Sequence, residues 1–489
     1  MSKLNRRDFI KSSMAAGAAT VLAAPYSRVR GANNDIRLAV VGTGGQGSNH
    51  IKYFDKLPGV RVVAICDVDK DHMERNVVNY FKKQNRKVDT YVDVRELLDN
   101  KNIDAITSAT PNFWHSLLTI WACQAGKDVY IEKPVSHNIW EGRKMVEAAR
   151  KYNRIVQTGT QKRSDQGLME AFKYIHQGNL GAIKWARGFC YKKRYKGTNG
   201  IVEGTNGPNP VPPSVDYNLW CGPANMEPLR RKQLHYKWHW VWNTGNGDLG
   251  NQGIHEMDLA RWALGQPKLA PRVLSIGGRF GVADAGETAN TQIVFLDYKP
   301  APLIFEVRGL PRKKGDTAMD YYRRVTQIGI VVQCENGYFA GGGGGGWVYD
   351  NNGNRFKQFK GQAGAGHHQN FIDAVRSRRV SDLNADIEQG HISSALCHMG
   401  NTSYRLGQTM SVGKIKEQLA RNAEVMDSFE RMVLHLVANE VDLKAEPVTI
   451  GPMLSMDPDK EEFVGELSAE ANMYLRRNYR EPFVIRDEV

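Results

Sequence analysis

The sequence predicts an α/β protein in which a doubly wound parallel sheet precedes an α+β domain with a large, mainly antiparallel open sheet. Between residues 35 and 160, short apolar segments alternate with amphipathic segments of helical length, a pattern typical of a parallel sheet. From residue 161 to 408, β-rich segments follow one another through Gly-, Pro- and Asn-containing turns, with few helices between them. This second pattern favours antiparallel pairing.

The elements of the first unit can be assigned in order. Apolar, β-branched segments predict strands at 36–41, 61–66, 104–109, 128–131 and 154–158. Amphipathic segments predict helices at 47–57, 71–83, 94–98, 116–125 and 141–152. Because each strand is followed by a helix, residues 35–160 are expected to form one domain.

The second unit, residues 161–408, contains a long insertion. A helix is predicted at 165–176, strands at 183–191, 272–280, 291–298, 303–310 and 327–334, and helices at 367–376 and 386–406. Residues 192–246 form an irregular insertion; its length indicates a functional or disordered segment, and its four tryptophans argue against disorder. The six-glycine run at 341–346 predicts a loop beside a strand, and residues 409–489 form a mixed C-terminal extension.

A glycine-rich turn follows the first predicted strand. Gly42-Thr43-Gly44-Gly45-Gln46-Gly47 has G-x-G-x-x-G spacing and opens a helix, so that the helix N-terminus can donate to phosphates. Gly42 permits the tight turn, Gly44 the approach of pyrophosphate, and Gly47 close helix–strand packing. Asp67, at the end of the second strand, is placed to accept from a ribose 2′-hydroxyl and to repel a 2′-phosphate. The pattern predicts an NAD site, with NADP less favoured.

Two further strand ends should border the same crevice, because ligands of open α/β sheets bind at the carboxyl ends of the strands. Thr110, Asn112 and His115 follow one strand. Thr and Asn suit hydrogen bonds to ribose or nicotinamide, but these residues fit equally well an ordinary turn at the end of a strand, without a role in binding. Glu132-Lys133-Pro134 follows the strand at 128–131. A residue before proline favours extended geometry, so Lys133 should project from the strand end towards the ligand.

Candidate substrate contacts lie beyond these motifs. Gln161 and Arg163 follow the last strand of the parallel sheet and could bind hydroxyls or a carboxylate, with a solvated loop as the alternative. Trp238 and Trp240 belong to an aromatic cluster over residues 235–242. Pyranose faces stack on such rings, although alternate spacing equally fits one face of a buried strand.

In this order the motifs resemble the glucose-fructose oxidoreductase/inositol dehydrogenase/MocA (Gfo/Idh/MocA) family. The resemblance rests on the residues above and continues through Gly159–Arg163 and through Gly247, His255 and Asp258, so that it covers most of residues 35–408. It implies an N-terminal Rossmann domain, a C-terminal α/β domain whose open sheet often serves oligomerisation, and sugar or cyclitol substrates. It also implies that Lys133 contacts nicotinamide ribose and substrate, and that His255 lies near the reacting carbinol.

Physical chemistry agrees with these implied roles. Hydride transfer from a carbinol needs a group that accepts the hydroxyl proton and a charge that stabilises the alkoxide. His255 and Lys133 are the catalytic candidates for the two tasks. Many members of the family carry Asp four residues before this histidine, whereas Asn251 stands here and can orient substrate hydroxyls but cannot act as a base. Asp248 could substitute only if the loop folds differently.

Residues 1–34 form a leader. The segment Asn5-Arg6-Arg7-Asp8-Phe9-Ile10-Lys11, followed by a weakly apolar stretch, resembles a twin-arginine export signal. The resemblance implies a periplasmic or otherwise exported protein that meets the twin-arginine export machinery already folded. Because free NAD is scarce outside the cytoplasm, we expect a cofactor that is loaded inside and retained.

The composition constrains partners. Six basic residues and one acidic residue of the leader account for about +5 of the net charge of +14, and the remainder is spread without a basic stripe, so nucleic acid is not expected. No apolar run beyond the leader is long enough for a spanning helix. Six scattered cysteines without CxxC spacing predict no metal site.

The sequence therefore predicts an exported NAD-dependent oxidoreductase that acts at a ring hydroxyl of a sugar, sugar derivative, cyclitol or glycoside. Asn251 and a retained cofactor also fit an alternative, an NAD-dependent glycoside hydrolase or lyase that oxidises, eliminates and re-reduces. A third class, a cofactor-binding protein without turnover, is disfavoured by the presence of both Lys133 and His255. A homo-oligomer through the C-terminal sheet is expected in either enzyme.

Overall fold

The computed structural model describes residues 35–196 and 199–489, and the leader lies outside this part. The first domain contains a six-stranded sheet in the order β3-β2-β1-β4-β5-β6. Every pair is parallel. The strands are β1 (Ile36–Val41), β2 (Val60–Cys66), β3 (Asp89–Tyr91), β4 (Ala105–Ser108), β5 (Asp128–Ile131) and β6 (Val156–Thr158). The predicted doubly wound sheet is confirmed, and its order reverses between β1 and β4, where a ligand crevice opens.

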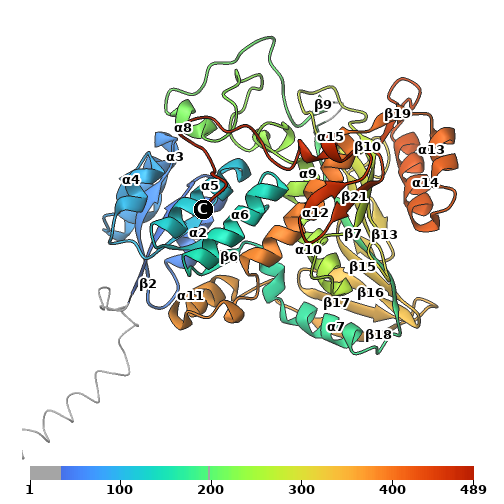
Figure 1. Cartoon of the computed structure of the whole chain (residues 1–489), viewed down its shortest axis with the longest axis horizontal. Coiled ribbons are helices and arrows are strands. Elements are labelled where there is room, and N and C mark those ends of the chain that lie inside the picture. The colour runs from blue at the N-terminus through green and yellow to red at the C-terminus, as the bar shows by residue number, and fades with distance from the viewer. Residues whose placement is uncertain (1–34, 197–198) are drawn as a thin grey trace, which may run out of the picture.

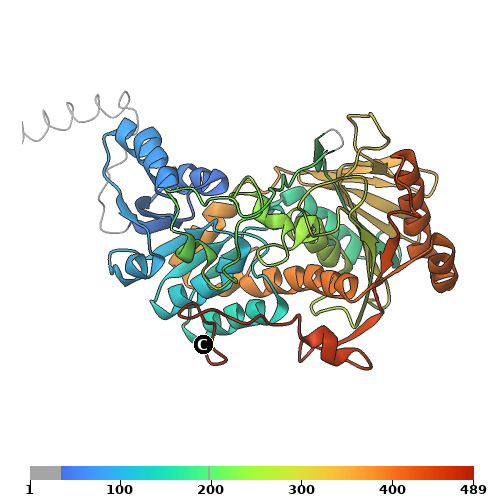
Figure 2. The ribbon, with the colours of Figure 1, turned by 90° about the horizontal axis from the view of Figure 1, so that it is seen from above.

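Helices cover both faces of this sheet (Figures 1 and 2). They are α2 (Gly45–Phe54), α3 (Lys70–Asn76), α4 (Val94–Asp99), α5 (Asn112–Gln124) and α6 (Ile139–Lys151). Alternate residues of a strand face opposite sides, and both sides of β1 are apolar: Leu38 and Val40 pack in one core cluster, Ala39 and Val41 in another. The helix expected at 71–83 is shorter, because α3 passes into a π turn at 77–81 and a 3-10 turn at 82–84.

The second domain is built on a twelve-stranded sheet. Its main path runs β18-β17-β16-β15-β7-β12-β11-β10-β20-β19, while β21 pairs with β10 and β22 pairs with β21. Only the β7–β12 pair is parallel, so the prediction of a mainly antiparallel sheet is confirmed. The strands are β7 (Ile183–Tyr191), β10 (Arg272–Gly278), β11 (Thr291–Leu296), β12 (Leu303–Arg308), β15 (Ile328–Cys334), β16 (Gly337–Gly342), β17 (Gly345–Tyr349), β18 (Arg355–Lys360), β19 (Gln408–Met410), β20 (Val448–Ile450), β21 (Leu454–Asp457) and β22 (Glu462–Val464).

Helices α7 (Gln166–His176), α10 (Gly253–Leu264) and α12 (Ile387–Arg405) pack on one face of this sheet and form its larger core. Helix α11 (His367–Ser377) instead packs Phe371 and Ile372 against the first domain. The remaining short elements are β8 (Tyr195–Lys196), β9 (Asn199–Gly200), α8 (Tyr217–Cys221), α9 (Gly247–Asn251), β13 (Tyr321–Tyr322), β14 (Val325–Thr326) and α15 (Ser468–Asn472).

The glycine run is a hairpin, where a loop beside a strand was expected. Gly341 and Gly342 belong to β16, and they pair with Gly346 and Gly345 of β17. A Cβ on Gly341 would lie 2.4 Å from the carbonyl oxygen of Gly345, so this close pairing requires glycine. Because glycine has no side chain, this segment lacks the alternation of apolar and polar residues by which a strand is recognised in a sequence.

The C-terminal extension covers the opposite face of the large sheet. Helices α13 (Val412–Leu419) and α14 (Ala423–Ala438) pack Ile415, Phe429 and Leu436 against residues of β7, β10 and β11 in a second core. Figure 1 shows the pair at the end of the molecule far from the first domain. The predicted homo-oligomer stays a prediction. It could form only through the part of the sheet that α14 does not cover.

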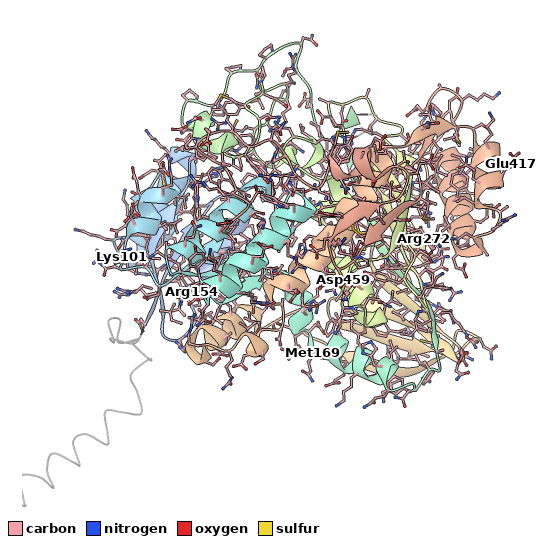
Figure 3. All side chains as sticks on the ribbon, in the orientation of Figure 1. Lys101, Arg154, Met169, Arg272, Glu417 and Asp459 are labelled. Carbon is pink, nitrogen blue, oxygen red and sulfur yellow. The ribbon has the colours of Figure 1, made fainter. Side chains whose placement is uncertain are left out.

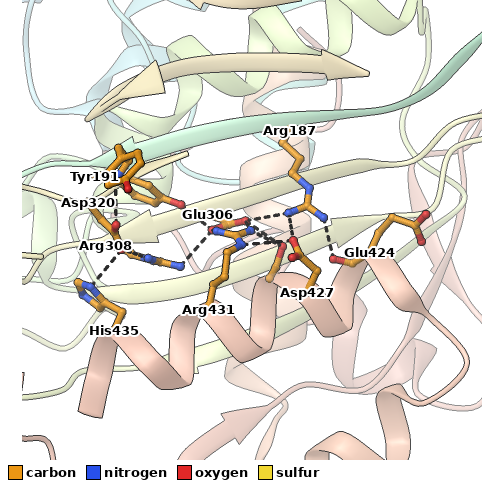
Figure 4. A network of polar contacts seen from close by, with 11 residues as sticks. Arg187, Tyr191, Glu306, Arg308, Asp320, Glu424, Asp427, Arg431 and His435 are labelled. Carbon is orange, nitrogen blue, oxygen red and sulfur yellow. Dashed lines mark hydrogen bonds and ion pairs between the residues drawn. The ribbon is translucent and has the colours of Figure 1, made fainter. Parts of the chain in front are cut away.

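A buried ionic network fixes α14 to the sheet (Figure 4). Glu306 of β12 is 1% exposed and accepts hydrogen bonds from Tyr191 at 2.6 Å, Ser428 at 2.8 Å and Arg431 Nη1 at 2.9 Å. Arg187 of β7 lies 3.6 Å from the same carboxylate. Burial alone would raise the pKa of Glu306, but the surrounding guanidinium groups lower it to about 2. The carboxylate is therefore charged and neutralised by both the sheet and the helix.

The described part of the insertion docks on the first domain. Asp69 forms a β-bridge with Val215, the Lys70 amide donates to the Ser214 carbonyl at 3.0 Å, and the Asp216 amide donates to Val68 at 2.9 Å. Figure 1 shows the insertion in green over the carboxyl ends of the first sheet. The tryptophan content thus correctly predicted an ordered segment.

Surface and core are chemically ordinary. In the view of Figure 3, charged side chains are spread over both domains, for example Lys101, Arg154, Arg272, Glu417 and Asp459. All six cysteines are buried free thiols. Within residues 35–196 and 199–489, no helix has the length and apolar character needed to cross a membrane.

Candidate cofactor and active site

The glycine turn has the geometry of a dinucleotide cradle. Gly42 adopts φ +77°, and a Cβ there would lie 2.8 Å from the Thr110 amide nitrogen. A Cβ on Gly47 would lie 1.7 Å from the Gly42 carbonyl oxygen, so both positions require glycine. Helix α2 begins at Gly45 without a side-chain cap, which leaves its first amide groups available to phosphates. These residues fit a bound dinucleotide.

Asp67 stands at the end of β2, beside this turn. Its Oδ2 accepts from the Thr43 amide at 2.6 Å and from the Thr43 hydroxyl at 3.0 Å, while Oδ1 accepts from the Asp69 amide at 2.9 Å. The carboxylate therefore orders the glycine turn as well as lining the crevice. A 2′-phosphate at this position would meet its negative charge.

A cavity of about 1,100 Å³ extends from the glycine turn to α10. It is lined by most of the predicted site residues: Gly42, Gly44, Gly45, Gln46, Asp67, Thr110, His115, Glu132, Lys133, Gln161, Trp238, Asn251 and His255. The structure thus brings residues from five strand ends and from the second domain to one space.

Five predicted residues do not line the cavity. Gly47 and Thr43 shape the turn from behind. Asn112 donates to Asn246 at 2.5 Å, Arg163 binds Asp258 through two nitrogens at 2.8 Å each, and Trp240 donates to Asp248 at 3.1 Å. These last three side chains are buried, with exposures of 2%, 7% and 1%. We therefore do not retain Asn112 as a cofactor contact, nor Arg163 and Trp240 as substrate contacts.

Glu132 organises the floor of the cavity. Its Oε1 accepts from Gln46 at 3.0 Å and from Gln161 at 3.4 Å, and lies 3.1 Å from His50 Nε2, whose Nδ1 faces Thr107 at 2.7 Å. Burial alone would raise the pKa of Glu132, but the hydrogen bond and charge of His50, together with Lys133, hold it below its ordinary value. The carboxylate is thus a fixed negative charge next to Lys133.

Lys133 reaches from the end of β5 to the second domain. Its Nζ donates to the Asn251 carbonyl at 3.0 Å and lies 3.5 Å from the Asn251 side-chain oxygen. An ammonium carries three N–H donors, so at least one remains for a ligand. Burial lowers the pKa of Lys133, and the charge of Glu132 opposes the shift.

His255 lies in the first turn of α10 and faces the same cavity. Neither ring nitrogen has a hydrogen-bond partner among the described residues, and Nδ1 is fully buried. Burial, followed by the charges of Lys133 and Lys162, holds the pKa of His255 well below its ordinary value. The imidazole is consequently neutral near pH 7 and able to accept a proton.

Asp248 does not replace the missing family aspartate. Its carboxylate accepts from Arg194 Nε at 2.8 and 2.9 Å and from the Trp240 indole at 3.1 Å. Both oxygens are thus committed, in a residue 1% exposed. Asn251 occupies the position next to Lys133, where it orients the ammonium.

His115 positions the strand ends. Nδ1 lies 2.7 Å from the Pro134 carbonyl and Nε2 lies 3.0 Å from the Thr110 carbonyl, so the ring joins the loops after β4 and β5. Burial lowers the pKa of His115 to about 4. The predicted residue lines the cavity, with both nitrogens directed at backbone oxygens.

The insertion provides a roof. Trp220, His235, Tyr236, Trp238 and His239 line the cavity from above, and the Trp238 and His239 rings stack at 3.6 Å. The cavity is also lined by Lys192 and Gln252, which motif analysis missed; Lys192 donates to Gln252 at 2.9 Å. No local pattern marks Lys192, because it reaches the site only through the pairing of β7 with β12.

Three side chains form a clamp beside Asp67. Asp69, His72 and His235 place one ligand-type atom each within 4.8 Å of one another, a spacing that could suit a metal ion, although the sequence analysis predicted none. His235 Nε2 already lies 2.8 Å from Asp69 Oδ2, and His72 Nε2 lies 3.6 Å from it. We interpret the group as a hydrogen-bonded clamp between the insertion and the first domain.

Comparison with known families agrees with this geometry. Residues 36–160 match the model described as "Oxidoreductase family, NAD-binding Rossmann fold", and residues 173–300 match "Oxidoreductase family, C-terminal alpha/beta domain". The chain belongs to the Gfo/Idh/MocA oxidoreductase family. Residues 3–23 match the signal sequence of the twin-arginine translocation pathway. The family and the export signal expected from the motifs are both confirmed.

Individual relatives are more distant. An inositol 2-dehydrogenase/D-chiro-inositol 3-dehydrogenase of Shouchella clausii is 33% identical over 148 residues, 30% of this chain and 42% of the relative. Glycosyl hydrolase family 109 protein 2 of a Shewanella species is 29% identical over 171 residues, 30% of this chain and 38% of the relative. Both matches span less than half of the relative's own length.

Among solved structures, the WlbA dehydrogenase of Bordetella pertussis in complex with NADH and UDP-GlcNAcA shares the fold. Its TM-score is 0.54 at 21% identity, over 76% of this chain and 97% of that one.

Proposed function

We propose that this member of the family is an exported NAD-dependent enzyme that acts by hydride transfer at a ring hydroxyl of a sugar, sugar derivative, cyclitol or glycoside. The observation that carries the proposal is the convergence of Lys133 and His255 on the cavity that begins at the glycine turn. When bound, NAD supplies the hydride acceptor. The chain itself supplies a proton acceptor, a fixed cation and a cavity lined by both domains.

Each of the two residues has one task. His255 takes the hydroxyl proton, because its lowered pKa keeps the ring neutral and its nitrogens have no other partner within the described chain. Lys133 holds the developing alkoxide with the N–H that Asn251 leaves free. Trp238 and Gln161 line the substrate end, where a ring face and hydroxyls can be bound.

We further propose that NAD is retained. The insertion roofs the crevice and is tied to the first domain beside Asp67 by the Asp69–His235 contact at 2.8 Å. A twin-arginine signal suits a protein that folds around its cofactor before export to the periplasm. Asp67 favours NAD over NADP through its charge.

Retention also supports a second candidate function, an NAD-dependent glycoside hydrolase or lyase. Such an enzyme restores its cofactor in every cycle and needs no exchange, which fits a roofed crevice in an exported protein. Some relatives are named glycosyl hydrolase family 109 proteins and others inositol dehydrogenases, so both candidates have named relatives.

One experiment separates the two candidates. Purified protein is denatured to release and quantify NAD, and native protein is incubated with a panel of glycosides and free sugars, with products identified by mass spectrometry. Oxidised sugar formed in proportion to an added acceptor supports the oxidoreductase, and cleaved glycoside without added NAD supports the hydrolase or lyase. Absence of any NAD in the protein, with no reaction when NAD is supplied, would refute both.

Retention has its own test. The His235→Ala variant should release NAD faster during gel filtration, because the roof loses its contact with Asp69. Lys232→Ala is the matched control, since Lys232 lies in the same insertion and its Nζ pairs with Glu203 at the surface. Equal cofactor content in the His235 variant, the control and the unmodified protein would count against the clamp.

A further inference from the structure

A second cavity, of about 580 Å³, lies apart from the proposed active site, and no residue lines both. Its walls come from the loop after β5 (His137), the end of the insertion (Trp242), helix α12 (Arg405) and the C-terminal segment (Tyr474 and Arg477). Its volume falls within the range of roughly 300–1,000 Å³ that is typical of small-molecule sites. Two of these four walls lie beyond residue 300, where the family match ends.

Two guanidinium groups of this wall lack a carboxylate partner. Arg477 donates through Nη2 to the Asn243 carbonyl at 2.6 Å and to its side-chain oxygen at 2.9 Å, while its buried Nη1 has no partner among the described residues. Arg405 makes no hydrogen bond or ion pair with the described chain, and its guanidinium lies 4.9 Å from the Trp242 ring and 4.3 Å from the Tyr474 ring. For the buried Nη1 of Arg477 the missing acceptor is costly; a ligand carboxylate would satisfy it and could pair with the exposed Arg405 guanidinium as well.

The remaining wall suits hydroxyl groups. Five asparagines line the cavity, namely Asn225, Asn243, Asn246, Asn401 and Asn478. The amides of Asn243, Asn246 and Asn401 already bond within the protein, whereas those of Asn225 and Asn478 have no partner in the described chain and can both donate and accept. Glu227 and Glu287 also line the cavity, and their carboxylates can accept from hydroxyls. His398 is 5% exposed with an unpartnered Nδ1, and burial lowers its pKa to about 3, so the ring is neutral and its nitrogen can bond a hydroxyl. Trp242 and Tyr474 add apolar ring surface.

We propose that this cavity is a second binding site, which takes a hexuronate, a pyranose that carries a carboxylate. Arg405 and Arg477 hold the carboxylate, and the asparagine amides and His398 hold the hydroxyls. A neutral sugar would leave the two guanidinium groups without a carboxylate, and a simple carboxylate would leave the Asn225 and Asn478 amides and His398 Nδ1 unused. The site is independent of the proposed reaction, since none of its residues faces Lys133 or the glycine turn.

The test uses the full-length protein with its cofactor and isothermal titration calorimetry. Glucuronate is expected to bind at least about tenfold more tightly than glucose or acetate. Arg405→Gln and Arg477→Gln should each weaken glucuronate binding at least about tenfold, because each removes a charge-assisted contact. Arg476→Gln is the matched control: Arg476 lines the same cavity, but its guanidinium already pairs with Asp487 at 2.5 Å, so binding should change by less than about threefold.

Lys133→Met locates the ligand, because it alters only the first cavity and should leave glucuronate binding unchanged. The proposal is overturned if glucuronate does not bind, if acetate binds as well as glucuronate, if both arginine variants bind normally, or if Lys133→Met abolishes binding. Loss of binding in the Arg476 control would overturn it too, since it would indicate general charge attraction. The Arg405 side chain is exposed and has no ion-pair partner among the described residues, so its replacement by Gln should not disturb folding. Arg405→Gln therefore keeps the proposal testable if Arg477→Gln fails to fold.

Discussion

Replacement of Lys133 by methionine tests the proposed chemistry most directly, because it keeps the length of the side chain and removes its charge. In the structure Nζ donates to the Asn251 carbonyl at 3.0 Å and retains a proton for a substrate oxygen. Loss of one donor aimed at a developing oxyanion costs about 2.7–4 kcal/mol. We therefore expect kcat to fall by about 10²–10³-fold, with sugar and NAD still bound.

The same substitution should change the pH profile. After burial, the charge of Lys133 is the largest influence that lowers the pKa of His255. Activity requires the neutral ring, so it is present above that pKa and is lost as the pH falls through it. For the unmodified enzyme this acid limb should lie below about pH 6.5, the ordinary histidine value. In Lys133→Met it should move upwards, and Lys133→Arg should keep it low.

Initial rates measured from about pH 4.5 to pH 9 would show both effects. Lys192→Met is a suitable control, because Lys192 lines the cavity and is a weaker influence on the same pKa. Full activity in Lys133→Met would show that the site is misassigned. If kcat fell strongly but the acid limb did not move, the group that titrates there would not be influenced by Lys133. His255 would then not be the base.

Three further changes test the cofactor site and the fold. Asp67→Asn should lower the NAD-over-NADP preference at least about tenfold in fluorescence titrations of stripped protein, because the repelling charge is gone; an unchanged ratio would contradict the assignment. His367 accepts from Ser164 at 2.6 Å and donates to Thr158 at 2.9 Å, and burial lowers its pKa to about 4. Because this lies below the unfolded value of about 6.5, its stability contribution is complete above pH 6.5 and is lost as the pH falls towards 4. In urea unfolding, the stability lost between pH 8 and pH 5 should be about 2 kcal/mol smaller in His367→Asn than in the unmodified protein. Glu306→Gln should lower the free energy of unfolding by about 3–5 kcal/mol, because it leaves buried guanidinium groups unpaired, whereas Glu440→Gln, at a surface pair, should change it by less than about 1 kcal/mol.

The cofactor half of the site was predictable because its determinants are local. Gly42, Gly47 and Lys133 are specified by a turn, a helix start and a strand end, each visible within a few residues. His255 was assigned through the family motif, and its exposure to the cavity depends on where α10 begins.

Arg163 and Trp240 show why the substrate half was harder to predict. An arginine after a strand looks like a ligand-binding group, but Arg163 meets Asp258, which lies 95 positions further along the chain. Trp240 similarly turns towards Asp248 and the core. Side-chain type indicates what a residue can bind, whereas the partner it meets depends on contacts between the two domains. The short strands β20 and β21 were missed for a related reason, since both pair with β10, which lies more than 170 positions earlier in the chain.

The helix pair α13–α14 gives the large sheet a cover that comes from the same chain. A face covered by a second subunit is exposed whenever that subunit dissociates, so its stability depends on protein concentration. Here the covering helix is tethered, and its effective concentration is set by a linker that dilution does not alter. A single copy can therefore complete this core before it meets another copy, and the core stays complete on dilution.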